Sequence, residues 1–128
     1  MKHEIIEKNI GLMALLMVFA IFFNSINGFI NGYEVFNANF YSMHWLQSPL
    51  FYTGLIIFLI GYRINFKSDK KLANLKSGTD TTYKIPRGGL FDQVSSPHYL
   101  GEIIEWTGWA IMTWSVSGLI FTLFTIAN

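Results

Sequence analysis

The chain lacks cysteine and is poor in charged residues. Without cysteine among its 128 residues, disulfide bonds, thiolate catalysis and cysteine-based zinc sites are all excluded. Charged residues make up only 13% of the chain, about half the share usual in soluble domains, and the net charge of +1 gives no reason to expect nucleic-acid binding. Apolar residues account for 52%, a balance typical of a membrane protein rather than of a soluble domain.

The phosphate-binding motifs of soluble nucleotide-binding folds are missing as well. No G-x-G-x-x-G fingerprint and no P-loop occur anywhere in the chain. The sequence also contains no internal repeat and no low-complexity tract. Its length allows one domain at most, or part of one.

Three stretches are apolar enough to cross a bilayer, which takes about 20 mostly apolar residues. They cover residues 10–30, 45–62 and 101–127. A cleaved signal peptide is the alternative for the first stretch, but acidic Glu4 and Glu7 precede it and no small-residue cleavage site follows. The predicted fold class is therefore all-α, a multi-span transmembrane helix bundle with about three spans.

Lysine and arginine are unevenly distributed around these spans. Lys2 and Lys8 precede the first span, and the other seven lie from Arg63 to Arg87, between the second and third spans. By the positive-inside rule, the N-terminus and the loop 63–100 are cytoplasmic. Three spans then place the C-terminus on the opposite side.

A polar, asparagine-rich zone separates the first two spans. The Asn-Gly pairs at residues 27–28 and 31–32 are turn signals. The spacing of Asn24, Asn27 and Asn31 is also compatible with one face of a helix, which would point into the bundle because amides facing lipid would be unsatisfied. Both interpretations stay open at this point.

The first part of the loop 63–100 predicts a helical continuation of the second span, ending at Gly78. On such a helix, Asn65, Asp69 and Lys76 fall within a narrow arc. They could line one face of a site. The alternative is a solvated helix with ordinary spacing of acidic and basic residues.

The second part of the loop contains backbone signals. Pro86 followed by Gly88 and Gly89 predicts a turn with conformations that other residues resist. Ser96 fits a helix N-cap with Pro97 at the first helical position. A helix is therefore expected to begin here and to continue into the third span.

Three polar residues share one face of that last helix. His98, Glu102 and Glu105 are spaced at i, i+4 and i+7, within about 60° of arc. Carboxylates are costly at the end of an apolar segment, so two on one face indicate a polar pocket. A metal site, a structural polar network and a site for a polar ligand such as a nucleotide all fit this pattern.

Three segments of the sequence together resemble a known family. "NGFINGY", "INFKSDKKLANLKSG" and "YKIPRGGLFDQVSSPHYLGEIIEWTGWAIMTWS" closely resemble the C-terminal half of steroid 5α-reductases (3-oxo-5α-steroid 4-dehydrogenases), over about residues 24–115. The resemblance implies an integral membrane oxidoreductase of steroid and lipid metabolism. Such an enzyme transfers hydride from NADPH to the Δ4 double bond of a 3-oxo steroid or similar enone lipid that enters from the bilayer.

The resemblance also assigns roles to individual residues. It places contacts to NADPH on Asn65, Asp69, Lys76, Tyr83, His98 and Glu102, with Glu105 and Trp106 supporting them from behind. Lys76 stands where relatives often have arginine, so its contact with a phosphate would lack the two-point geometry of a guanidinium group. His98 stands where some relatives have asparagine. The resemblance implies no metal.

Parts of the family pattern have no counterpart here. The tyrosine and glutamate that bind the steroid carbonyl lie in an N-terminal half that this chain does not match, so no catalytic residue is assigned. We expect residues 1–128 to form a partial enzyme domain that is inactive alone. A complementary chain that supplies the missing helices is one expected partner. The alternatives are an isoprenylcysteine-type methyltransferase using S-adenosylmethionine, and a non-enzymatic membrane subunit that needs a partner.

Overall fold

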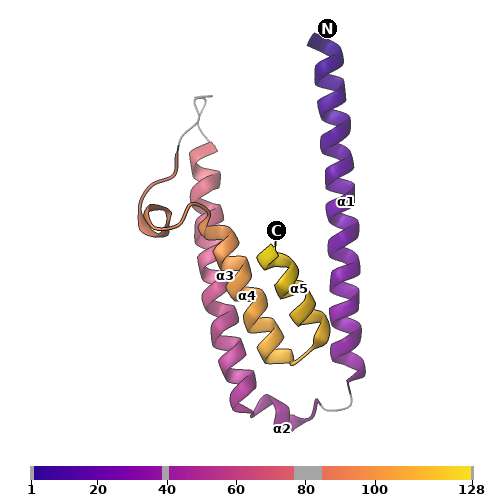
Figure 1. Ribbon diagram of the computed structural model, residues 1–128, viewed down its shortest axis with the longest axis vertical. Coiled ribbons are helices and arrows are strands. Elements are labelled where there is room, and N and C mark those ends of the chain that lie inside the picture. The colour runs from indigo at the N-terminus through magenta and orange to yellow at the C-terminus, as the bar shows by residue number, and fades with distance from the viewer. Residues whose placement is uncertain (1, 39–40, 77–84, 128) are drawn as a thin grey trace. The chain divides into compact units, whose positions relative to one another are not determined.

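The computed structural model describes residues 2–38, 41–76 and 85–127, and every regular element among them is helical. In chain order the elements are α1 (Lys2–Asn37), α2 (Met43–Leu46), α3 (Pro49–Lys76), the 3-10 helix η1 (Gly89–Asp92), α4 (Pro97–Thr113) and α5 (Val116–Ala127) (Figure 1). The predicted all-α class is confirmed. The chain divides into two compact units, Met1–Asn37 and Ala38–Asn128, which are described separately.

The first unit is the single long helix α1, which continues through both Asn-Gly pairs. Its asparagine side chains bond to the helix itself: Asn24 Nδ2 donates to the carbonyl oxygen of Ala20 (2.8 Å), and Asn31 Nδ2 to that of Asn27 (3.0 Å). Because these side-chain amides find hydrogen-bond partners within the helix, the backbone can stay helical through the Asn-Gly pairs. The helical interpretation of this zone is therefore correct, and the turn interpretation is wrong.

Within the described part of the chain, two helices are long and apolar enough to cross a membrane, over Asn9–Asn37 and Pro49–Leu75. The second lies in α3, whose 28 residues extend about 42 Å, well beyond a hydrocarbon core of about 30 Å. The predicted helical continuation of the second span is thus confirmed as far as Lys76. The predicted stop at Gly78 lies outside the described residues.

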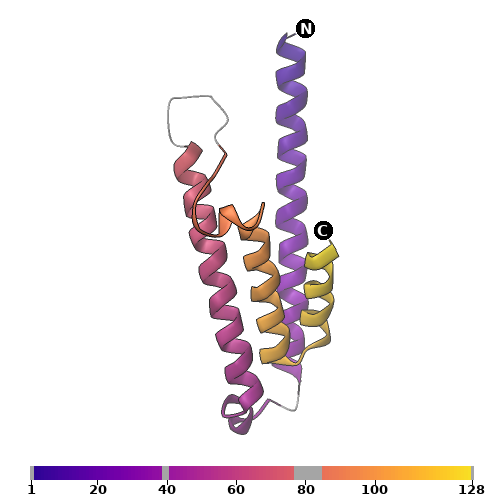
Figure 2. The same ribbon diagram turned by 60° about the vertical axis from the view of Figure 1, so that its left-hand side comes forward.

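The predicted third span, residues 101–127, is divided into two helices in the structure. α4 ends at Trp114, which adopts the left-handed conformation (φ 49°), and α5 then runs back along α4 (Figures 1 and 2). Ser115 begins α5 by accepting a hydrogen bond from Gly118 N through its Oγ atom (3.2 Å). At about 26 Å and 18 Å, neither helix reaches across the hydrocarbon core of a bilayer by itself.

Two aromatic side chains from the segment before α3 cover the end of α4. Trp45 Nε1 donates to the carbonyl oxygen of Met112 (3.1 Å), and the Tyr41 hydroxyl donates to that of Thr113. The last carbonyls of a helix have no partner within the helix, so these bonds satisfy groups that would otherwise be left unpaired. They also fix the segment around α2 against the second unit's helix pair.

Four glycines bring the backbones of α3 and α4 into direct contact. The helices run antiparallel along one another, with Gly54 and Gly61 on α3 facing Gly101 and Gly108 on α4 (Figure 2). A Cβ atom on Gly61 would lie 2.7 Å from the carbonyl oxygen of Gly101, and one on Gly108 would lie 2.7 Å from that of Gly54. Small residues allow this close approach in membrane helix pairs.

The connection into α4 has the predicted glycine turn. Gly88 and Gly89 both have positive φ, at 91° and 67°. Gly88 N donates to Asp92 Oδ1 (2.7 Å), and Lys71 Nζ on α3 donates to the Gly88 carbonyl oxygen (2.9 Å). α4 begins at Pro97 with Ser96 at the N-cap, as predicted, although the Ser96 side chain makes no capping hydrogen bond.

Candidate functional site

The glycine contact between α3 and α4 positions the first polar residue of the site. Asn65 lies one turn beyond Gly61, and a Cβ atom on Gly101 would lie 2.5 Å from the Asn65 backbone nitrogen. The Asn65 side chain lies next to the Glu105 carboxylate of α4. Its carbonyl oxygen Oδ1 is buried and has no hydrogen-bond partner among the described residues. Asn65 thus lies against α4 and keeps a buried acceptor that no described residue satisfies.

The remaining polar residues meet around Glu102. The half-buried Glu102 carboxylate interacts electrostatically with His98, one turn earlier on α4, and with Asp69 on α3. The His98 ring packs against Tyr99, with 4.2 Å between ring centroids. His98 Nδ1 is buried without a partner in the described part of the chain. The structure therefore brings together Asp69, His98 and Glu102 across the helix pair.

This arrangement is rich in hydrogen-bond acceptors. Asp69, Glu102 and Glu105 supply carboxylate oxygens, and Asn65 Oδ1 adds a free carbonyl. Such a face suits a ligand that donates hydrogen bonds through amide or hydroxyl groups. No group of three or more His, Asp or Glu side chains able to hold a metal occurs among the described residues, so the geometry does not support the metal interpretation.

Three of the predicted site residues either lie away from this cluster or fall outside the part of the chain that the structure describes. Trp106 packs edge-on against Phe121 of α5, with ring centroids 4.2 Å apart, and so supports α4 from the side of α5. Lys76 is the last residue of α3, and its side chain is outside the described part. Tyr83 also lies outside the described residues.

Sequence reasoning missed the residues that hold the two site helices together. Gly54 and Gly61 are seven residues apart, as are Gly101 and Gly108. Seven residues are about two helical turns, so each pair lies on one face. This repeated spacing in two neighbouring helices is a readable signal for close packing, and it sets the distance between Asn65 and Glu105.

Comparison with known proteins identifies the family. A family model described as 3-oxo-5-alpha-steroid 4-dehydrogenase matches residues 10–128. The chain belongs to the steroid 5α-reductase family. The chain is 43% identical over 109 residues to 3-oxo-5-alpha-steroid 4-dehydrogenase 1 of Mus musculus, 42% over 118 residues to that of Homo sapiens, and 49% over 114 residues to Steroid 5-alpha-reductase DET2 of Solanum lycopersicum.

These matches cover nearly all of this chain but only part of each relative. They include 85%, 92% and 88% of the chain, against 43%, 45% and 44% of the mouse, human and tomato proteins. The chain therefore spans less than half the length of these steroid 5α-reductase relatives. The resemblance inferred from the sequence segments is confirmed at the level of the family.

Proposed function

We propose that this chain forms the NADPH-binding part of a membrane oxidoreductase that reduces the Δ4 double bond of a 3-oxo steroid or a similar enone lipid. Membership in the steroid 5α-reductase family supports the reaction class. The observation that carries the proposal is the acceptor-rich face between α3 and α4, with the unpartnered Asn65 Oδ1 at its centre. The activity belongs to relatives about twice as long, so it is proposed here for the assembled enzyme.

The residues present fit the nicotinamide end of the cofactor. Its carboxamide and ribose hydroxyl groups are donors, which Asn65 Oδ1 and the Glu102 carboxylate can accept. His98 can donate or accept through Nδ1, depending on its tautomer. A buried acceptor without a donor costs about 1–3 kcal/mol, so a ligand that supplies one is favoured at this position.

The phosphate groups of the cofactor require a different environment. Asp69, Glu102 and Glu105 would repel them, since like charges raise the free energy of a low-dielectric site. Lys76 lies seven residues after Asp69, so its Cα falls on the same side of α3 but nearer the connection to α4. We assign the phosphate end to Lys76 and Tyr83.

NADPH, when bound, supplies the hydride for the reduction. The roles of this chain are to hold and orient the cofactor and to exclude water from it by the close α3–α4 contact. Hydride acceptance also requires a donor at the enone oxygen, which makes the ring carbon electrophilic. None of the residues assigned here is placed for that task, and we propose that another segment supplies it and that the 128-residue chain alone is inactive.

A ligand-binding experiment tests the proposal. The purified chain in a mild detergent is titrated with NADPH and with S-adenosylmethionine while the fluorescence of its four tryptophans is followed. Tighter binding of NADPH is expected. Tighter binding of S-adenosylmethionine would favour the methyltransferase alternative, and binding of neither would favour a non-enzymatic subunit. Turnover of a Δ4-3-ketosteroid by the chain alone would contradict its proposed dependence on another segment.

A further inference from the structure

A stripe of residues on α3 changes from apolar to cationic along its length. Ile56, Leu59 and Ile60 are followed on the same face by Arg63 and Lys67, and then by Lys70. At about 100° per residue, all of them lie within roughly 60° of one line along the helix. Asn65 lies on the opposite face, so this stripe is separate from the site between α3 and α4.

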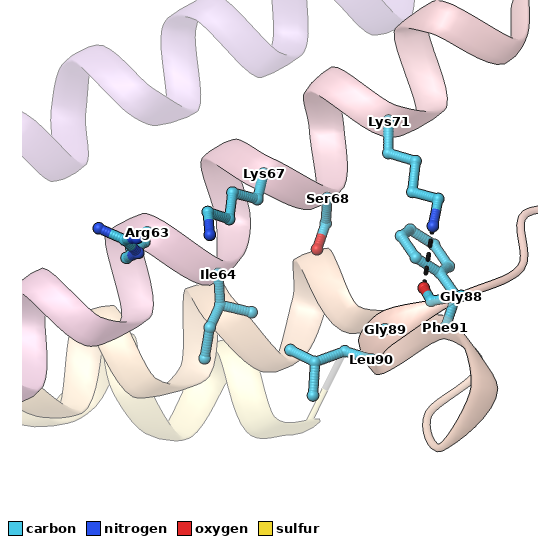
Figure 3. A pocket seen from close by; sticks show the side chains of 9 residues that line it. All are labelled: Arg63, Ile64, Lys67, Ser68, Lys71, Gly88, Gly89, Leu90 and Phe91. Atoms are coloured by element: carbon cyan, nitrogen blue, oxygen red, sulfur yellow. Dashed lines mark hydrogen bonds between the residues drawn. The ribbon is translucent and has the colours of Figure 1, made fainter.

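Two adjoining hollows lie along the stripe. The lower one, about 720 Å³, is lined by the apolar stretch together with Tyr62, Phe66 and three cations, Arg63, Lys67 and Lys70. The upper one, about 390 Å³, lies between α3 and the turn at Gly88–Phe91 (Figure 3). Arg63 and Lys67 line both hollows, so the two lie next to each other on α3.

The hollows are lined by cations without a carboxylate among the described residues. The acidic side chain in the turn, Asp92, accepts a hydrogen bond from Gly88 N. Asp69 lines neither hollow and lies near Glu102, on the side of α3 that faces α4. Lys71 donates to the Gly88 carbonyl oxygen and lies 5.5 Å from the Phe91 ring centroid, so it closes the end of the pocket (Figure 3).

We propose that this groove binds an anionic phospholipid, with the phosphate among Arg63, Lys67 and Lys70 and an acyl chain along Ile56, Leu59 and Ile60. The apolar stretch is exposed, with Ile56 at 58% and Ile60 at 50%, and lies within a helix apolar enough to span a membrane. The cations begin one turn later, and charged side chains favour the end of a membrane span over its centre. Basic pockets at this depth beside membrane helices are suited to anionic headgroups.

The proposal commits to a lipid because a single hollow is lined by both the apolar stretch and the three cations. A free phosphate would use the cationic pocket but would leave the apolar groove unused. A zwitterionic lipid would fill the groove but would gain little from three cations. Only an amphiphile with a net negative headgroup matches both parts of the stripe.

Photolabelling of the full 128-residue chain tests this inference. The chain is reconstituted in phosphatidylcholine vesicles containing a trace of phosphatidylserine with a diazirine in its acyl chain, and labelled peptides are mapped by mass spectrometry. Labelling within residues 56–67 is expected, and unlabelled phosphatidylserine should compete far better than phosphatidylcholine. Equal competition by phosphatidylcholine would overturn the proposal. Competition by inorganic phosphate at similar concentrations would assign the pocket to a free anion.

A matched pair of variants tests the cationic contact. Lys67→Gln should reduce labelling about fivefold, the effect expected for one cation near an anionic surface, and Arg63→Gln should act in the same direction. Arg87→Gln, which removes an exposed cation outside both hollows, should leave labelling unchanged. Equal losses of labelling in Lys67→Gln and Arg87→Gln would mean that labelling depends only on net charge, and would contradict the proposed binding site. A photoreactive residue at position 60 that crosslinks to protein rather than lipid would assign the groove to a protein partner.

Discussion

A Cβ atom on Gly61 of α3 would lie 2.7 Å from the carbonyl oxygen of Gly101 on α4, so these two residues mark a contact between backbones. No side chain fits between the helices at this point. The polar side chains one turn away, including Asn65 and Glu105, face each other because the backbones are this close. The candidate site therefore depends on residues that carry no functional group.

Gly61→Ala should force α3 and α4 apart. Because the added methyl group meets backbone atoms, which cannot move away singly, we expect a loss of about 1–3 kcal/mol in the free energy of unfolding and weaker NADPH binding. Gly11→Ala in α1 is the control, since its Cβ atom would meet nothing within 4 Å in that helix. Thermal unfolding in detergent measures both variants. Equal stability of the two would contradict the close-packed interface.

Glu102→Gln should weaken NADPH binding. The carboxylate is a stronger acceptor than the amide, and hydrogen bonds to charged groups contribute about 1.5–3 kcal/mol, so a 10–100-fold increase in Kd is expected. Asp92→Asn is the matched control, because it removes the same charge from an exposed turn and keeps an oxygen to accept from Gly88 N. Fluorescence titration with NADPH compares the two. Similar losses of affinity would remove Glu102 from the cofactor face.

The absence of cysteine allows a clean test of membrane orientation. Single cysteines at positions 47 and 87, introduced as Gln47→Cys and Arg87→Cys, flank the candidate span Pro49–Leu75. The cluster of lysine and arginine after this span predicts that position 87 is cytoplasmic and position 47 is not. In intact cells, a membrane-impermeant maleimide should label position 47 only. Labelling of position 87 alone would reverse the orientation.

Ser115→Ala should destabilise the start of α5. The Ser115 hydroxyl accepts from Gly118 N and bonds to Thr113 Oγ1 (2.7 Å), and it is 4% exposed. Loss of a helix N-cap costs about 0.5–2 kcal/mol, and the buried Thr113 hydroxyl also loses a partner. Ser95→Ala, at an exposed position before α4, serves as the control. Circular dichroism during thermal unfolding should give a lower Tm for Ser115→Ala only.

The parts of the fold that could be predicted are those encoded by local signals. Pro97 after Ser96 defines the start of α4, and Gly88 and Gly89 define the turn, because each acts through its own backbone conformation. The all-α class followed from the long apolar runs. The family was inferred from the resemblance of three sequence segments to known enzymes, not from physical properties of the residues. The assignment of individual residues to NADPH contacts stays a prediction.

The features that could not be predicted depend on contacts between distant segments, or on an unfavourable backbone conformation that hydrogen bonds elsewhere stabilise. Trp114 adopts a left-handed conformation that is unfavourable for a bulky residue, and nothing in the apolar run from residue 101 to 127 indicates it. The turn is stabilised by Ser115 and by the bonds from Tyr41 and Trp45 to the end of α4. The asparagines of α1 left a turn and a helix open in the sequence, and the structure shows a helix in which the amides of Asn24 and Asn31 bond to the preceding helical turn.

The α3–α4 pair also bears on how the protein assembles. All the described residues of the site lie between positions 65 and 105, on two helices that follow one another in the chain. Contacts between α3 and α4 require closure of only the 20 residues from 77 to 96, so they can form before contacts between segments farther apart in the chain. The two helices can associate as soon as α4 leaves the ribosome. Any segment that completes the enzyme would then dock onto a hairpin that is already formed.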